Sequence, residues 1–185
     1  MSSALTARAK LQVEQGEWRA AIATLNPLIA TAPLDPELLG QRGIAHARQG
    51  ETALANRDFT AARAQAHTAR ALNALCWSKA TANVALARAL EECEAAMALA
   101  PDAAQVADSR AFVLLRLGRL DDAIGQYDKA LARAPRLPAS LYGRALAEER
   151  KGDHAAARRD AEAALKLSAA VKDEFDGFGM TLPAA

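Results

Sequence analysis

The side chains that could perform chemistry are few and widely scattered along the chain. The 185 residues include only two cysteines, Cys76 and Cys93, and three histidines that lie far apart in the sequence. A structural zinc site needs about four Cys or His ligands, and a catalytic one needs a close spacing such as HExxH, so neither is predicted. No glycine-rich phosphate loop and no GxSxG nucleophile motif is present. We therefore predict a protein that is not an enzyme, with no catalytic residue, no metal and no cofactor.

The composition indicates which elements must carry any binding site. Hydrophobic residues make up 51% of the chain and aromatic residues only 4%, with abundant Ala, Leu, Arg and Glu and few Val or Ile. These are strong helix formers, and strand formers are scarce, so the fold class is predicted to be all-α. The length suits a single domain over residues 1–185.

Charge and hydropathy exclude two classes of partner. The formal net charge is +1, which gives no general attraction to nucleic acid, and no run of about 18 apolar residues predicts membrane insertion. The N-terminal stretch MSSALTARAKLQVEQGEWR has no apolar core, so it does not read as a signal peptide. A cytoplasmic location is therefore expected, unless an upstream signal has been removed.

The chain repeats itself with a fixed period. Gly16, Gly50, Gly118 and Gly152 are each followed five residues later by alanine, and two pairs of these glycines are 34 residues apart. This pattern, carried best by SRAFVLLRLGRLDDAIGQYDKALARAP (residues 109–135), resembles the tetratricopeptide repeat, a helix–turn–helix unit of 34 residues. The resemblance implies an α-solenoid of five units plus a C-terminal capping helix, wound into a right-handed superhelix. We divide the chain into units 2–35, 36–68, 69–103, 104–137 and 138–171, with a capping segment 172–185.

The third unit departs from the strict count. That count would put Trp77 where two helices nearly touch, and an indole would force them apart. A shift of one residue instead places Cys76 there and gives the left-handed turn to Asn83, a residue that tolerates this conformation. The run NALCWSKATA also resembles a segment of uncharacterised bacterial tetratricopeptide proteins. In the capping segment, Phe175 and Phe178 continue the phase of a helix, and the alternative is a disordered tail.

Two pairs of charges are predicted to connect the helices within a unit. Arg42 with Asp58, and Arg144 with Asp160, occupy equivalent positions that should lie at one level of two antiparallel helices. We interpret them as structural salt bridges, because a buried arginine needs a partner. The alternative is a phosphate-binding row of arginines.

The two cysteines should face one another across the helix pair of the third unit. Cysteine often serves as a small buried hydrophobic residue, and we predict this for Cys76 and Cys93. The alternative is a disulfide between them, which would imply an oxidising compartment such as the periplasm.

In tetratricopeptide proteins the first helix of each unit lines the inner, concave surface. The resemblance therefore implies an apolar stripe there, beside a stripe rich in arginine. The predicted groove residues are Ile44, Arg48, Arg70, Asn73, Trp77, Phe112, Arg116, Tyr142, Leu146 and Arg150. An exposed apolar patch with a charged rim is typical of an interaction site, and the alternative is that the stripe packs between neighbouring helices.

These observations predict a non-catalytic module that binds a protein or peptide segment in the concave groove. The partner should carry apolar and acidic side chains, and the chain itself should be a monomer or a weak homodimer. One alternative is a structural scaffold that assembles with copies of itself. Another is a regulatory domain cut from a larger protein.

Overall fold

The computed structural model describes residues 2–183, and this part of the chain folds into eleven α-helices without a β-strand. Ten of them form five antiparallel pairs, and the eleventh follows the last pair. The all-α helical repeat predicted from the sequence is confirmed. The helices are α1 (Ser2–Glu14), α2 (Trp18–Thr31), α3 (Pro36–Arg48), α4 (Thr52–Gln65), α5 (Ala69–Thr81), α6 (Leu86–Leu99), α7 (Ala104–Arg116), α8 (Leu120–Arg133), α9 (Pro138–Lys151), α10 (His154–Leu167) and α11 (Ala170–Gly177).

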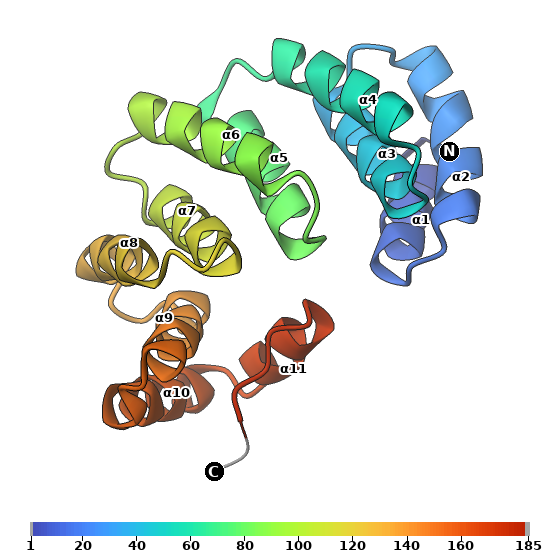
Figure 1. Cartoon of the computed structure of the whole chain (residues 1–185). Coiled ribbons are helices and arrows are strands. Elements are labelled where there is room, and N and C mark those ends of the chain that lie inside the picture. Colours follow the sequence, from blue (N-terminus) through green and yellow to red (C-terminus); the bar gives the residue numbers. More distant parts are fainter. Residues whose placement is uncertain (1, 184–185) are drawn as a thin grey trace.

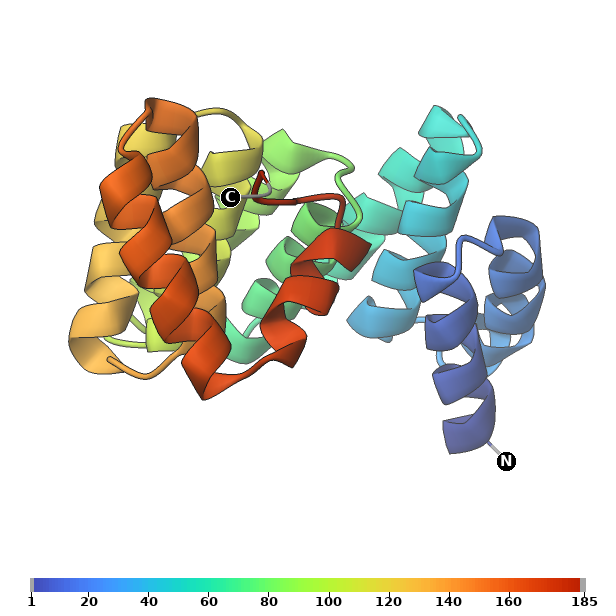
Figure 2. The ribbon, with the colours of Figure 1, turned by 90° about the horizontal axis from the view of Figure 1, so that it is seen from below.

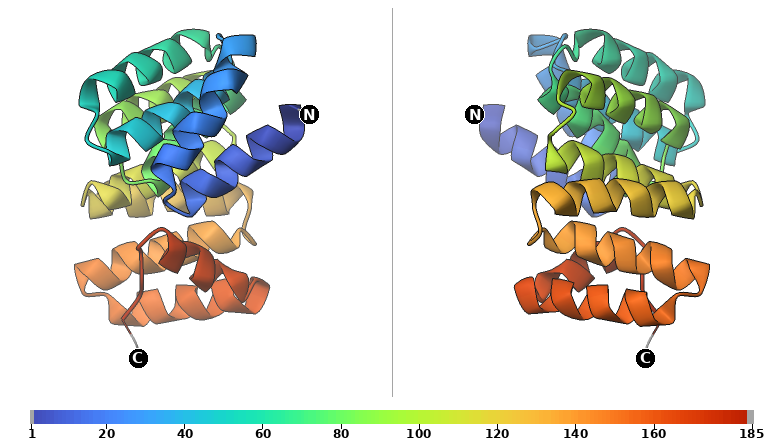
Figure 3. Two further views of the ribbon diagram at one scale, coloured as in Figure 1. Left: turned by 90° about the vertical axis from the view of Figure 1, so that its right-hand side faces the viewer. Right: turned by 90° about the vertical axis from the view of Figure 1, so that its left-hand side faces the viewer.

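The five pairs follow an arc, and α11 lies inside it (Figure 1). Seen from the side, the green, yellow and orange pairs α5–α6, α7–α8 and α9–α10 lie one above another (Figure 3). The odd-numbered helices α3, α5, α7 and α9 contact one another in sequence, so they form the inner layer of the arc. None of the described helices has the length and apolar content needed to cross a bilayer.

The turns within the pairs use left-handed backbone conformations. Gly16, Gly50, Gly118 and Gly152 have φ values of 75°, 78°, 74° and 88°, which glycine adopts without the steric cost of a Cβ atom. In the pair α5–α6, Asn83 and Ala85 adopt this conformation instead, at φ 52° and 47°. This longer turn accompanies the one-residue shift predicted for the third unit.

Small residues stand where the helices cross. The alanines at the equivalent position of each second helix are at most 3% exposed; they are Ala21, Ala55, Ala89, Ala123 and Ala157. Two glycines allow an even closer approach. A Cβ atom at Gly43 would lie 2.6 Å from the Phe59 ring, and one at Gly143 would overlap the Tyr127 hydroxyl. Ridge-into-groove packing of neighbouring helices needs such small side chains at the contact.

The buried side chains form separate clusters along the arc. The largest cluster joins α5 to α11 and includes Phe112, Tyr127 and Phe175. A second cluster joins the first pairs around Leu25, and a small third cluster surrounds Phe59. The residues around the inner surface therefore belong to two different packing units.

Candidate binding surface on the inner layer

The apolar stripe predicted to be open on the inner surface is largely buried. Ile44, Phe112, Tyr142 and Leu146 are only 1–2% exposed, and Trp77 alone remains partly accessible. The expectation of an open apolar stripe was therefore wrong. Two different features of the structure cover these side chains.

The first feature is α11, which folds back onto the inner surface. The ring of Phe175 lies 5.6 Å from that of Phe112 and 5.0 Å from that of Tyr142, measured between centroids. Phe178 follows α11 and lies 5.8 Å from both Trp77 and Phe112. Figure 2 shows α11 in red beside the orange pair α9–α10, with the green helices behind it. The capping segment thus occupies the predicted groove, where aromatic pairs add to the burial of apolar area.

The second feature covers Ile44, which belongs to another cluster. Ile44 and Phe59 are buried together, with Val13 and Trp18 of the first pair and Val84 of the α5–α6 turn packed against them. This is the alternative considered from the sequence, in which the stripe packs between neighbouring units. Ile44 therefore does not join the site around α11.

The arginine stripe is present, and its members bind main-chain carbonyl groups. Arg48 donates to the carbonyl oxygen of Ala82, Arg116 to that of Thr81 at 3.3 Å, and Arg150 to that of Leu115 at 3.4 Å. Each carbonyl lies at the C-terminal end of a neighbouring inner helix, where cations interact favourably with the helix dipole. These arginines therefore have a structural role that the sequence did not predict.

The same arginines leave positive charge without a carboxylate partner. Within residues 2–183, none of Arg48, Arg116 and Arg150 forms an ion pair. Burial lowers the pKa of Arg116, and the nearby charges of Arg150 and Arg48 lower it further. The Arg116 Nε atom is buried and has no hydrogen-bond partner. This edge of the surface is therefore suited to receive an acidic group.

Two predicted groove residues lie away from the segment that α11 covers. Arg70 is exposed and lines a shallow hollow with Asp35 and Glu37, between the N-terminal ends of α3 and α5. Asn73 is half-buried, and its Oδ1 atom has no hydrogen-bond partner. The structure thus gathers six of the ten predicted residues around α11 and its following segment. They are Trp77, Phe112, Arg116, Tyr142, Leu146 and Arg150.

A buried carboxyl group lies beneath α11. Asp108 of α7 is 9% exposed and accepts a hydrogen bond from the hydroxyl group of Ser140 on α9. Burial raises the pKa of Asp108 to about 6, the Ser140 hydrogen bond opposes this shift, and the nearby charge of Glu174 on α11 adds to it. Ionisation of Asp108 therefore places two like charges where α11 meets the inner layer.

Both predicted salt bridges within units are present. Arg42 Nε lies 2.7 Å from Asp58 Oδ2, and Arg144 Nε lies 2.5 Å from Asp160 Oδ2. Hydrogen bonding to these carboxylates raises the pKa of both guanidinium groups. Arg144 also lies 2.6 Å from Asp128 of the preceding pair, and Arg42 donates to Asn26 of its preceding pair. Both arginines are therefore engaged by the protein itself, which gives no support to a phosphate-binding row.

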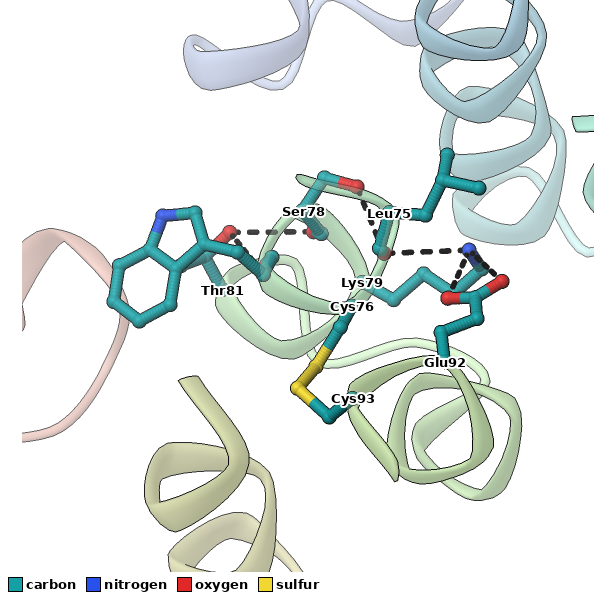
Figure 4. The surroundings of a disulfide bond; sticks show 8 residues. Leu75, Cys76, Ser78, Lys79, Thr81, Glu92 and Cys93 are labelled. Carbon is teal, nitrogen blue, oxygen red and sulfur yellow. Dashed lines mark hydrogen bonds and ion pairs between the residues drawn. A yellow bond between two sulfur atoms is a disulfide. The ribbon is translucent and has the colours of Figure 1, made fainter. Parts of the chain in front are cut away.

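The third unit uses a different pair of charges. Lys79 Nζ lies 2.8 Å from Glu92 Oε2, with both side chains at most 3% exposed (Figure 4). Burial lowers the pKa of Lys79 and raises that of Glu92, while each charge opposes the shift of the other. Sequence reasoning missed this pair. Glu92 occupies the same position within its repeat as Asp58 and Asp160. No arginine stands at the matching position of the third unit, and this absence could have indicated that Glu92 has a different partner.

The two cysteines are joined. Cys76 of α5 and Cys93 of α6 form a disulfide beside the Lys79–Glu92 pair, and their Cα atoms are 5.4 Å apart (Figure 4). The prediction of two buried thiols was therefore wrong, and the alternative of a disulfide holds. The one-residue shift is the physical reason, because it brings the two side chains face to face at a Cα separation that suits the bond.

Comparison with known proteins decides the family. The model of the tetratricopeptide repeat family matches residues 6–55 and 109–172, which is more than half of the sequence. The chain belongs to the tetratricopeptide repeat family. The stretch between the two matches contains the shifted third unit. No curated protein matches the sequence.

Solved structures share the fold of this tetratricopeptide protein at low sequence identity. TTC0263, described as a thermophilic tetratricopeptide protein of Thermus thermophilus, is 18% identical with a TM-score of 0.69, and the match covers 97% of each chain. A MamA fragment from Desulfovibrio magneticus RS-1 is 20% identical with a TM-score of 0.58, over 91% of this chain and 96% of that one. MamA of MSR-1 is 19% identical with a TM-score of 0.57, over 91% and 97%.

The family and the fold define the coarse function. Tetratricopeptide repeats are in general non-catalytic, and this chain is a protein-interaction or assembly scaffold with protein partners. The described residues contain no group of three or more His, Cys, Asp or Glu side chains placed to hold a metal ion.

Proposed function

We propose that this protein is a non-catalytic scaffold that binds a peptide or protein segment on the inner surface formed by α5, α7 and α9. One observation carries the proposal: this surface already holds a helical segment, because Phe175 and Phe178 pack against Trp77, Phe112 and Tyr142. A surface that buries Phe175 and partly covers Phe178 has the chemistry to bind aromatic side chains of another chain.

The electrostatics of the surface support a ligand that is both apolar and acidic. Trp77 offers a partly accessible aromatic ring that packs against the buried Phe112, while Arg116 and Arg150 carry charges that no carboxylate neutralises in the described structure. Apolar contacts should supply most of the affinity. The arginines should orient the ligand and speed its association, which makes binding sensitive to salt.

A site-directed crosslinking experiment tests the proposal. A photoreactive phenylalanine analogue at position 77 probes the inner surface, and the same analogue at the exposed position 158 on α10 probes the outer layer. In a lysate of the source organism, we expect the analogue at position 77 to crosslink to a protein. The Arg116→Glu substitution should reduce the yield of this crosslink. Capture from position 158 alone would place the binding site on the outer layer and contradict the proposal.

We also propose that the protein works in an oxidising compartment. The support is the Cys76–Cys93 disulfide, because such bonds persist in secreted and periplasmic proteins and are rare in the cytosol. Alkylation of free thiols in intact cells, before lysis, tests this proposal. Complete alkylation of both cysteines in the native host would show a reducing environment and contradict it.

A further inference from the structure

We propose, resting on the proposed inner-surface binding, that α11 and its following residues stand in for the partner in the free protein. The partner is then an amphipathic helix that carries an aromatic pair three residues apart and displaces α11. The proposal goes beyond a general peptide groove, because it assigns a sequence pattern to the ligand and a competitor within the chain.

The pattern comes from the side chains that α11 buries. Val171 and Phe175 are 2% and 1% exposed, and Phe178 packs beside them on the inner surface. They stand at i, i+4 and i+7, which places all three on one face of a helix. By contrast, Lys172 and Asp173 are exposed. A ligand helix therefore needs an aliphatic residue, then an aromatic residue four positions later, and a second aromatic residue three positions after that.

The arginine edge determines what should follow the second aromatic residue. Arg116 donates to the carbonyl oxygen of Phe178, and Arg150 Nη2 lies 3.3 Å from the sulfur of Met180. A thioether sulfur is a weak acceptor, and Arg116 Nε has no acceptor at all. A carboxylate at this end of the ligand would accept charge-assisted hydrogen bonds that the chain's own tail does not provide. The partner is therefore expected to carry an acidic group within the few residues that follow its aromatic pair.

Several features make α11 a replaceable occupant. The helix has only eight residues, lacks a side-chain cap at its N-terminus and ends at Gly177, so it is a poor helix in isolation. The carboxylate of Glu174 also lies in the field of Asp108, which is a like-charge contact. Only Ser168 and Ala169 separate α11 from α10, so these two residues form the connection about which α11 would move.

A synthetic peptide provides the probe. The fluorescently labelled sequence AAVKDEFDGFGMTL of residues 169–182 is titrated against the full chain and against the full-length variant Phe175→Ala/Phe178→Ala. We expect the variant to bind the peptide at least ten times more tightly than the wild type, because an attached competitor acts at a high effective concentration. A peptide with both phenylalanines changed to alanine is the matched control and should not bind.

A second variant keeps the proposal testable in case the double variant does not fold. Phe178 is only partly buried, so Phe178→Ala should retain the fold, as checked by circular dichroism. In a Trp18→Phe background, where Trp77 is the remaining indole, this change should at least double the acrylamide quenching constant of Trp77. An unchanged quenching constant would show that the tail does not cover this surface and would overturn the proposal.

The outcomes also separate this inference from the proposed function. If the wild type and the folded Phe175→Ala/Phe178→Ala variant bound the peptide with equal affinity, the displacement of α11 would be overturned. Equal crosslinking of a protein to position 77 in the wild type and in this variant would overturn it as well. In that second case the proposed inner-surface function would stand. Stable dimers of the wild type that form by exchange of α11, detected by light scattering, would identify a second copy as the occupant and overturn the assignment to a partner helix.

Discussion

Lys79 of α5 and Glu92 of α6 form a buried ion pair with Nζ and Oε2 only 2.8 Å apart. It corresponds to the Arg42–Asp58 bridge of the preceding pair, but its members are 13 rather than 16 residues apart. The ammonium group also lies 4.8 Å from the centre of the Phe59 ring on α4, so the lysine links two units of the array.

Replacing Lys79 should expose how much the array depends on this pair. Lys79→Met leaves Glu92 buried without its partner, and removal of one member of a buried pair costs about 3–5 kcal/mol. Urea unfolding measures the loss. The double variant Lys79→Met/Glu92→Leu removes both charges and should recover most of the stability. If the double variant were as unstable as the single one, lost packing rather than an unpaired charge would be the cause.

The contribution of Asp108 to the stability of the protein should fall as pH rises from about 4 to about 6. The pKa of Asp108 is raised from 3.8 to about 6, so in this range the folded chain holds a proton that the unfolded chain has released. This one group therefore lowers the free energy of unfolding by about 1–3 kcal/mol across the range and by no more above it. Asp108→Asn should abolish this component because an amide does not titrate, and the amide oxygen can still accept the Ser140 hydrogen bond. Denaturant unfolding at a series of pH values measures the effect.

A second carboxyl group needs a separate control in that experiment. Burial raises the pKa of Glu148 to about 7, with a contribution from Asp160 that Arg144 opposes. The contribution of Glu148 to the free energy of unfolding also falls as pH rises, but this fall extends to higher pH than that of Asp108. Glu148→Gln should remove the upper part of the curve and leave the Asp108 part. A pH profile unchanged in Asp108→Asn would mean that the carboxyl group is not buried as described.

Two helical glycines provide a matched pair of substitutions. Gly143→Ala places a methyl group against the Tyr127 ring, and such overpacking typically costs about 1–3 kcal/mol. Gly125→Ala meets no atom within 4 Å and should stabilise the helix by about 0.5–1 kcal/mol. Thermal or urea unfolding of the two variants should therefore show opposite signs. Equal effects would contradict the close contact of α8 and α9.

The disulfide should contribute measurably to stability. It links residues 17 positions apart, and a loop of this size is typically worth about 2–4 kcal/mol. Urea unfolding of Cys76→Ala/Cys93→Ala measures the loss. Thiol titration of the denatured, unreduced wild type should find no reactive thiol, whereas two reactive thiols would show that the bond is absent in solution.

The repeat pattern predicted much of the fold because small residues mark helix crossings. The alanines that follow the turn glycines at a fixed spacing, such as Ala55 and Ala123, prove to be buried where helices cross, and the steric conflict at Trp77 revealed the shift of the third unit. The Arg42–Asp58 and Arg144–Asp160 bridges followed from antiparallel geometry. These features depend on local spacing, which a single sequence displays.

The exposure of the inner surface was less predictable, because it depends on where α11 packs in the folded chain. The spacing of Phe175 and Phe178 indicates a helix with an apolar face, but it does not determine which surface that face covers. Arg116 and Arg150 resembled free ligand-binding groups, since their carbonyl acceptors are main-chain atoms that no sequence pattern identifies. The two facing cysteine positions suit either a pair of buried thiols or a disulfide, so their spacing in the sequence does not decide between these states.

The return of α11 to the inner surface should change how the array melts. In a repeat protein with contacts only between neighbours, unfolding proceeds by fraying from either end. Here Phe178 contacts Trp77 two pairs back, and the disulfide closes the pair that carries Trp77. Helices α5 to α11 therefore form a closed cooperative block, whereas α1 to α4 keep a free end. In native-state hydrogen exchange, the amides of α7 and α9 should share one opening free energy, and those of α1 and α2 should exchange first.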